Sequence, residues 1–284
     1  MSSLVQIRKP EKGKTDAGAK EAQLLRRLAE FPSLLIAVSG GADSAYLAWA
    51  AHQVLGAKAL SVTAISPSYS AYDRAELETF IAHAGVRHEF VETHEMDNPA
   101  YRANAGDRCY YCKDELFNVL DEIAAAREFA AVAYGVNADD TSDFRPGQRA
   151  AAEHRVIAPL LDAKMSKEDI RALSKRAGLP TWDRPASACL SSRLPYGTEV
   201  TPERLSLVER GEAILRELGF RQFRVRLHEE LARIEIAPDE MPAAMTLEKS
   251  AEISQRFKAA GFLYVALDLE GYRQGSLNAA LKKK

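Results

Sequence analysis

Cysteine is scarce in this chain, and long hydrophobic runs are missing. Only three of the 284 residues are cysteine, which is an odd number and too few for a disulfide scaffold. The longest aliphatic run covers residues 34–38, whereas a membrane-spanning helix needs about 20 apolar residues. Residues 1–20 are polar and lack the apolar segment of a secretory signal. The sequence therefore predicts a cytoplasmic protein with reduced thiols and no membrane partner.

Neither sign of charge dominates the composition. Lysine and arginine total 38, aspartate and glutamate total 40, and the formal net charge is −2. Proteins that bind nucleic acid are usually basic, so this balance argues against a nucleic-acid partner. Hydrophobic residues make up 46% and charged residues 27% of the chain. This composition is typical of a globular protein and excludes a largely disordered or fibrous chain.

Short apolar segments alternate with segments of helical periodicity in the first two thirds of the chain. We expect helices at residues 16–30, 45–56, 71–84, 112–129 and 167–178. We expect strands at residues 34–38, 57–65, 86–93, 130–136 and 155–160. Apolar strands separated by helices predict an α/β fold with a doubly wound, mostly parallel sheet.

The organisation changes near residue 185, within a stretch that holds four prolines between residues 179 and 202. Beyond it we expect helices and strands at residues 203–218, 222–228, 231–236, 246–260 and 262–268. This pattern predicts a small α+β unit. We therefore expect a flexible arm over residues 1–15, an α/β domain over 16–185 and a smaller α+β domain over 186–284.

The turn SGGADS follows the first expected strand and begins a helix. Backbone N–H groups and the dipole at a helix N-terminus favour an anion, and Gly40 and Gly41 allow a phosphate to approach closely. Ser39 and Ser44 add hydroxyl groups, and Asp43 beside a phosphate site suits either of two roles, holding Mg²⁺ or orienting an amide that binds the phosphate. The turn lacks the GxxxxGK[ST] pattern of kinases and GTPases. An ordinary strand–turn–helix connection is the alternative interpretation.

The three cysteines form a CxxC pair, Cys109 and Cys112, and a distant Cys189. A redox pair, a zinc site with a fourth ligand from elsewhere, and plain core packing are possible interpretations. Three thiolates with an open fourth position also suit an iron–sulfur cluster. The spacing alone leaves these alternatives open.

The segment FRVRLH places Arg224, Arg226 and His228 on one side of an expected strand. The next strand adds Arg233 and Glu235, and a hairpin would bring both sets onto one face. This excess of cationic donors suits a ligand with phosphate and carboxylate groups. A half-exposed sheet with solvated charges is the common alternative.

Several longer motifs resemble known families. SGGADS is similar to the SGGxDS loop of the PP-loop ATP pyrophosphatases. RCYYCK with ELF, PASACLSSR with PYG, FRVRLHEELARIEI and FLYVALDLEGYRQGSLN resemble the LarE family, the sulfur transferases of nickel-pincer nucleotide synthesis. This second resemblance covers about residues 16–278.

The LarE resemblance implies a reaction. ATP adenylates a carboxylate of pyridinium-3,5-biscarboxylic acid mononucleotide, Mg²⁺ neutralises the departing pyrophosphate, and sulfur then replaces AMP. The resemblance places ATP on the residues of the SGGADS loop and near Ser66, Gly135, Asn137 and Asp140. It places the nucleotide substrate on Arg224, Arg226 and Glu235, to which we add Arg193, and it places Glu212 near the phosphate and a possible Mg²⁺.

The resemblance also implies two possible sulfur sources. Family members with one cysteine lose its sulfur and retain dehydroalanine, and that residue would be Cys189 here. Members with three cysteines hold a four-iron (4Fe–4S) cluster with an extra sulfide, a pattern that Cys109, Cys112 and Cys189 match. A tRNA thiolase is the alternative enzyme, although the balanced charge argues against it. A non-catalytic metal-binding protein is a third possibility. We also expect a homo-oligomer.

Overall fold

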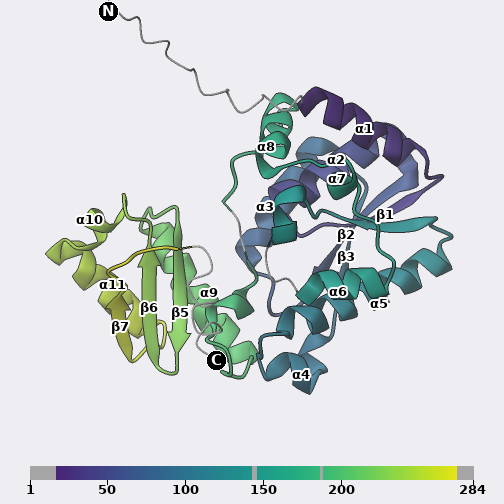
Figure 1. The fold of residues 1–284 in the computed structure, drawn as a ribbon. Helices are drawn as coiled ribbons and strands as arrows, with labels where there is room; N and C mark the ends of the chain where they lie inside the picture. The colour runs from purple at the N-terminus through teal and green to yellow at the C-terminus, as the bar shows by residue number, and fades with distance from the viewer. Residues whose placement is uncertain (1–16, 143–145, 186–187, 274–284) are drawn as a thin grey trace, which may run out of the picture.

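The computed structural model describes residues 17–142, 146–185 and 188–273. Its first sheet has four parallel strands in the order β3-β2-β1-β4 (Figure 1). The strands are β1 (Leu34–Ala37), β2 (Ala59–Ile65), β3 (His88–Glu92) and β4 (Ala131–Tyr134). All four residues of β1 are buried, as expected for a central parallel strand that is covered on both faces.

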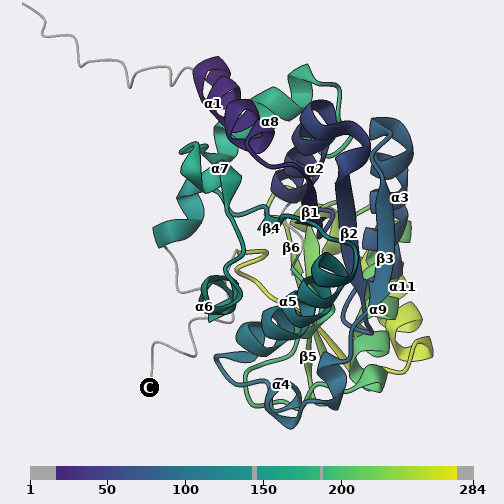
Figure 2. The ribbon, with the colours of Figure 1, turned by 90° about the vertical axis from the view of Figure 1, so that its right-hand side faces the viewer.

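Helices cover both faces of this sheet. Leu34 and Ile36 of β1 pack in a core with one set of helices, α1 (Ala17–Ala29), α2 (Ala42–Leu55), α3 (Ala71–Ala84) and α8 (Lys167–Arg176). Leu35 and Ala37 pack against the other set, α5 (Arg108–Ala126) and α6 (Pro146–Glu153), which lie side by side in both ribbon views (Figures 1 and 2). Alternate residues of one strand therefore enter two cores, and the predicted α/β fold is confirmed.

The prediction of a strand at residues 155–160 is wrong. Only Ile157 forms a bridge, with Ala133 of β4, because Pro159 begins the short helix α7 (Pro159–Asp162). Proline lacks a backbone N–H and fits the first turn of a helix. The expected start of α5 at residue 112 is also wrong. The helix begins at Arg108, so the CxxC pair lies in its first turns.

The second sheet has three strands, β5 (Phe223–His228), β6 (Leu231–Ile236) and β7 (Tyr264–Leu267). β5 and β6 are antiparallel, and β7 is parallel to β6. The apolar face of this sheet packs with α9 (Pro202–Glu217) and α11 (Leu247–Ala259). Thr201 caps α9 and Pro202 occupies its first position, which explains why the helix begins there.

The second core is shared with the first part of the chain. Tyr101, in the short helix α4 (Pro99–Arg102), packs with Leu190 and with the residues of β5 and β6. The predicted boundary between residues 185 and 186 therefore stays a prediction, and residues 186–187 lie outside the described part. The short helix α10 (Met241–Ala244) was not predicted. The predicted arm and Asp16 also lie outside the described residues.

No helix in the described ranges combines the length and the apolar character that a membrane span requires.

Candidate functional site

The Ser39–Ser44 loop joins the buried strand β1 to α2 at the carboxyl edge of the first sheet. The Ser44 Oγ accepts a hydrogen bond from the Ser39 backbone N–H at 3.2 Å and donates one to the Gly41 carbonyl at 3.2 Å. Gly40 has φ +82°, a conformation that favours glycine. Gly41 at the N-cap of α2 provides no side-chain cap within the described part of the chain, so the first N–H groups of this helix can bind an anion.

Residues at the end of β4 meet this loop. The Asn137 Nδ2 donates to the Asp43 Oδ2 at 3.1 Å, and the Asp140 Oδ2 accepts from the Asn137 backbone N–H at 3.3 Å. A Cβ atom on Gly135 would lie 2.7 Å from the backbone of Ser44. Only glycine therefore permits this close approach of the two segments.

Asp43 has an unsatisfied oxygen. Its Oδ1 is buried and has no hydrogen-bond partner among the described residues. Burial raises the pKa of the Asp43 carboxyl, the nearby Lys167 and Arg171 oppose this rise, and the charge of Asp140 adds to it. A buried carboxylate oxygen without a partner beside two cationic side chains fits a site for a hard cation and its anionic ligand.

Arg184 was missed by the sequence analysis. Its Nη1 donates to the Gly40 carbonyl at 2.8 Å, and its Nη2 donates to the Asp73 Oδ1 at 2.6 Å. The guanidinium thus connects the Ser39–Ser44 loop to the start of α3. No periodic pattern predicts this contact, because Arg184 lies in the proline-rich stretch, 144 residues from Gly40.

Ser66 lies after β2 and contacts a second residue that the sequence analysis missed. Its Oγ donates to the Glu95 Oε1 at 2.5 Å, and the Ser68 Oγ lies 3.3 Å from the same oxygen. Glu95 is buried, and its Oε2 has no hydrogen-bond partner among the described residues. The Ser68 carbonyl accepts from the Leu190 backbone N–H at 2.9 Å. The loop after β2 therefore contacts the segment that carries Cys189.

The three cysteines are free thiols, with Cys109 exposed and the other two half-buried. Burial raises the pKa of the Cys112 thiol, and the charges of Glu95, Cys189 and Cys109 raise it further. The Arg108 guanidinium contacts both the Ser191 carbonyl at 2.7 Å and the Cys109 Sγ at 3.8 Å, so the structure brings the segment of the distant Cys189 near the CxxC pair. In the described part of the chain, no group of three or more His, Cys, Asp or Glu side chains is arranged to hold a metal ion. The iron–sulfur cluster stays a prediction.

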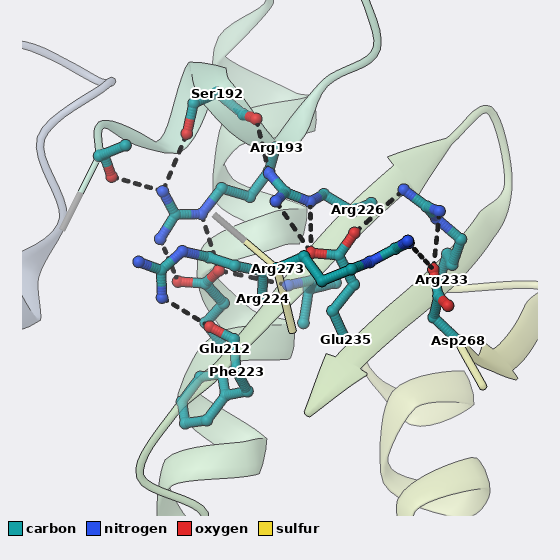
Figure 3. Close-up of polar contacts among 12 residues, drawn as sticks. Ser192, Arg193, Glu212, Phe223, Arg224, Arg226, Arg233, Glu235, Asp268 and Arg273 are labelled. Atoms are coloured by element: carbon teal, nitrogen blue, oxygen red, sulfur yellow. Dashed lines mark hydrogen bonds and ion pairs between the residues drawn. The ribbon is translucent and has the colours of Figure 1, made fainter. Parts of the chain in front are cut away.

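The polar side of β5 and β6, which we call the arginine face, consists of Arg224, Arg226, His228, Arg233 and Glu235. The Glu235 Oε2 accepts from the Arg226 Nε at 3.1 Å and from its Nη2 at 2.9 Å, and the Glu235 Oε1 accepts from Arg233 at 3.1 Å (Figure 3). Arg226 and Arg233 lie directly opposite each other in the hairpin, and the fully buried Glu235 neutralises this like-charged pair.

Arg193 and Glu212 form a second buried ion pair beside the arginine face. The two guanidinium–carboxylate distances are 2.8 and 3.0 Å. Burial favours the neutral form of Glu212, but Arg193 prevails and lowers the pKa of this carboxyl. The predicted role of Glu212 near Mg²⁺ stays a prediction, because Arg193 occupies both carboxylate oxygens.

Arg224 lies beside this ion pair. Its Nη1 donates to the Phe223 carbonyl at 2.6 Å, and its guanidinium lies 5.1 Å from the centre of the Tyr272 ring. Burial lowers the pKa of Arg224, and the positive charge of Arg193 lowers it further. The Arg226 Nη1 donates to the Ser192 carbonyl at 2.9 Å, so the arginine face adjoins the segment after Cys189.

Comparison with known proteins identifies the family. No family model matches the chain. The chain is 44% identical over 265 residues to an uncharacterized protein of Synechocystis, covering 93% of this chain and 99% of that protein. It is 34% identical over 267 residues to the pyridinium-3,5-bisthiocarboxylic acid mononucleotide synthase of Lactiplantibacillus plantarum, covering 93% of this chain and 95% of the synthase. The chain belongs to the LarE family.

Membership of the LarE family confirms the resemblance that the sequence motifs indicated. An uncharacterized protein of Methanocaldococcus jannaschii is also 34% identical, but over only 170 residues. In this LarE family member, the predicted site residues form three groups: the Ser39–Ser44 loop with the end of β4, the three cysteines, and the arginine face. A hydrogen bond from Leu190 to Ser68 joins the Cys189 segment to the loop that carries Ser66, and one from Arg226 to Ser192 joins it to the arginine face.

Proposed function

We propose that the chain is an ATP-dependent sulfur transferase that acts on pyridinium-3,5-biscarboxylic acid mononucleotide. The observation that carries this proposal is the similarity to the Lactiplantibacillus synthase over nearly the full length of both chains. A substrate carboxylate oxygen attacks the α-phosphorus of ATP, and pyrophosphate leaves. Sulfur then attacks the carbonyl carbon, the carbon–oxygen bond to AMP breaks, and a thiocarboxylate forms.

The Ser39–Ser44 loop fits the role of the ATP-binding PP-loop. The uncapped N-terminus of α2 provides N–H donors for the phosphates. The unpartnered Asp43 Oδ1 fits a Mg²⁺ ion, which when bound would neutralise the charge of the pyrophosphate. Lys167 and Arg171 are close enough to interact electrostatically with Asp43, and they would stabilise the same leaving group.

The thiols of Cys109, Cys112 and Cys189 fit an iron–sulfur cluster. They are unpaired, near one another and from two distant segments, and the chain has no fourth cysteine. A four-iron cluster bound there would supply a transferable sulfide from an iron without a protein ligand. In the alternative chemistry, the Cys189 thiolate itself attacks the adenylate, and cleavage of its Cβ–S bond leaves dehydroalanine.

The arginine face fits the anionic groups of the substrate. The Arg224 guanidinium lies 5.1 Å from the centre of the Tyr272 ring, and burial together with the positive charge of Arg193 lowers its pKa. An anion at this position would relieve that repulsion. Arg193 and Arg226 lie beside it and hold the segment after Cys189 through the Ser192 side chain and carbonyl. The substrate carboxylate would therefore lie near Cys189.

The test measures pyrophosphate release from Mg-ATP with and without the mononucleotide. We expect release that depends on the mononucleotide, together with a thiocarboxylate product when sulfide is supplied anaerobically. Release that is independent of the mononucleotide, or no release at all, would contradict the proposed function.

Intact mass after turnover separates the two sulfur sources. A cluster-bound sulfide leaves the protein mass unchanged, whereas loss of the Cys189 sulfur lowers it by ~34 Da, the mass of H₂S. The double variant Cys109→Ala/Cys112→Ala gives an independent test. Full activity of this variant without iron would exclude the cluster.

A further inference from the structure

Arg108 is a buried cation at the first position of α5, next to Cys109. It is 6% exposed. Its Nη1 donates to the Asn104 Oδ1 at 2.7 Å and to the Ser191 carbonyl at 2.7 Å. Its Nη2 lies 3.8 Å from the Cys109 Sγ. One guanidinium therefore connects the CxxC turn to the segment after Cys189, across 83 positions of sequence.

Arg108 differs from two other buried arginines, Arg193 and Arg226, in what balances its charge. Arg193 and Arg226 pair with Glu212 and Glu235. In the described ranges of the chain, Arg108 has neutral hydrogen-bond acceptors and no carboxylate partner. A buried charge without a counter-charge is costly. The Cys109 Sγ, 3.8 Å from the Arg108 Nη2, is a contact that would supply a negative charge as a thiolate.

The residues around Arg108 hold it in place. The Asn104 Nδ2 donates to the Pro195 carbonyl at 2.8 Å. The Tyr101 hydroxyl lies 2.7 Å from the Ser191 Oγ, and Ser191 is fully buried. Both sides of the segment after Cys189 are thus fixed to the α4–α5 region, and Arg108 is the charged member of this network.

We propose that Arg108 is the positioning residue of the three-thiol centre. Its planar guanidinium fixes the distance between Cys109 and the Cys189 segment, and its charge balances the thiolates that bind a cluster. This inference rests on the proposed function for the role of the thiols. Lysine could supply the charge but could not reproduce the planar, multiply donating geometry.

The experiment compares four full-length proteins: wild type, Arg108→Met, Arg108→Lys and the control Arg102→Met. Arg102 lies one helix earlier, and its side chain is 45% exposed in a long ion pair with Glu199. Thermal unfolding first establishes that each protein is folded. If Arg108→Met does not fold, Arg108→Lys carries the test.

The first readout is iron per chain and the electron paramagnetic resonance spectrum after anaerobic reconstitution. Arg108→Met should retain about a tenth of the wild-type iron or less, because loss of a charge-assisted contact typically changes an equilibrium about tenfold or more. Arg108→Lys should restore part of the iron but give a changed spectrum. Arg102→Met should match the wild type.

The second readout needs no metal. A short bis-maleimide is added to the reduced, metal-free proteins, and the yield of the Cys109–Cys189 cross-link is measured by peptide mass spectrometry. We expect a several-fold lower yield in both Arg108 variants and a wild-type yield in Arg102→Met.

The two readouts separate the inference from the proposed function. A wild-type protein that binds no iron would contradict the cluster, and the cross-link yield alone would then decide the role of Arg108. If the wild type binds iron and both Arg108 variants keep its iron content, spectrum and cross-link yield, the inference is overturned and the proposed function stands.

Discussion

The Ser39–Ser44 loop and the arginine face differ in how their polar groups are paired. Around the loop, backbone N–H groups at the start of α2 and the Asp43 Oδ1 remain without side-chain partners in the described residues. On the arginine face, Glu235 binds both Arg226 and Arg233, and Asp268 also binds Arg233. The loop is held by hydrogen bonds from Ser44, Asn137 and Arg184, whereas the arginine face is held by ion pairs among its own residues.

This difference predicts how mutations should act in the two regions. Removing a polar group from the loop should impair ligand binding and leave the fold intact, because that group contributes little to internal packing. Removing a charge from the arginine face should also destabilise the protein, because a buried partner loses part of its counter-charge.

The largest expected effect is on stability, in Arg226→Ala. This change leaves Glu235, which is fully buried, with Arg233 as its remaining cationic partner. Breaking a buried ion pair in this way typically costs about 3–5 kcal/mol. Urea unfolding should show the loss, and the exposed Arg221→Ala variant should unfold like the wild type. Unchanged stability in Arg226→Ala would mean that the ion pair contributes nothing to the fold.

The double variant Arg226→Met/Glu235→Leu sharpens the same comparison. Replacing both partners by apolar residues removes the buried carboxylate that has lost its Arg226 partner, so most of the lost stability should return. Substrate binding should remain at least about tenfold weaker than in the wild type, because the cationic contact is still missing. Calorimetric titration with the mononucleotide measures this. Wild-type affinity in the double variant would show that Arg226 does not bind the substrate.

Asp43→Asn should have a catalytic effect without a structural one. Loss of the carboxylate should slow pyrophosphate release roughly 100-fold or more, because Mg²⁺ loses an anionic ligand at the leaving group. The unfolding midpoint should stay close to that of the wild type, since the Asp43 Oδ1 has no partner to lose in the described structure. The exposed Asp162→Asn variant serves as the control. Near wild-type release in Asp43→Asn would contradict the assignment of the loop.

Gly135→Ala tests the packing that positions Asp43. A Cβ there would lie 2.7 Å from the backbone of Ser44, so either β4 or α2 must move. We expect a loss of about 1–3 kcal/mol in the free energy of unfolding, as for other overpacked sites. Gly41→Ala is the matched stability control, because its Cβ would meet only the Ser39 Oγ at 3.6 Å. Equal stability of the two variants would show that the end of β4 can move freely.

The smallest expected effect is on the pH dependence of stability. Burial lowers the pKa of His88 from 6.5 to about 4, and neither ring nitrogen has a partner in the described residues. The unfolded state therefore binds more protons between these two values, so stability falls as the pH drops from 6.5 towards 4. His88→Gln should reduce this fall in stability at acid pH, which we call the acid limb, when unfolding is measured by urea titration at several pH values. If His88→Gln loses as much stability between pH 6.5 and pH 4 as the wild type, other groups cause that loss.

His228 provides the corresponding test on the arginine face. Burial lowers its pKa, and the charges of Arg233 and Arg226 lower it further. Its protonation would add a charge to a cationic face, although Glu235 partly offsets this. We therefore expect His228→Gln to flatten the acid limb as well, and a salt dependence should distinguish it from His88→Gln. Equal response of both variants to salt would contradict this electrostatic explanation.

Much of the fold was predictable because local patterns encode it. The unbroken apolar run of Leu34–Ala37 predicts a buried strand, and the Gly- and Ser-rich turn that follows it predicts the location of the loop. The alternation of residues 223–228 predicted which side of β5 is polar, and the structure confirms that Val225 and Leu227 are buried with the second core. The strand expected at residues 155–160 does not form, because its apolar residues precede a proline that starts a helix.

The sequence by itself determined the strands other than the one expected at residues 155–160, the Ser39–Ser44 loop, the polar side of β5 and the membership of a family, because each depends on residues close together in the chain. Only the tertiary structure decided that Arg184 contacts Gly40, that Glu95 accepts from Ser66, and that Arg108 connects Cys109 to the segment after Cys189. Such contacts join residues 29 to 144 positions apart. These contacts depend on the order of the strands and on how the two cores pack together, and no local sequence pattern predicts either of these.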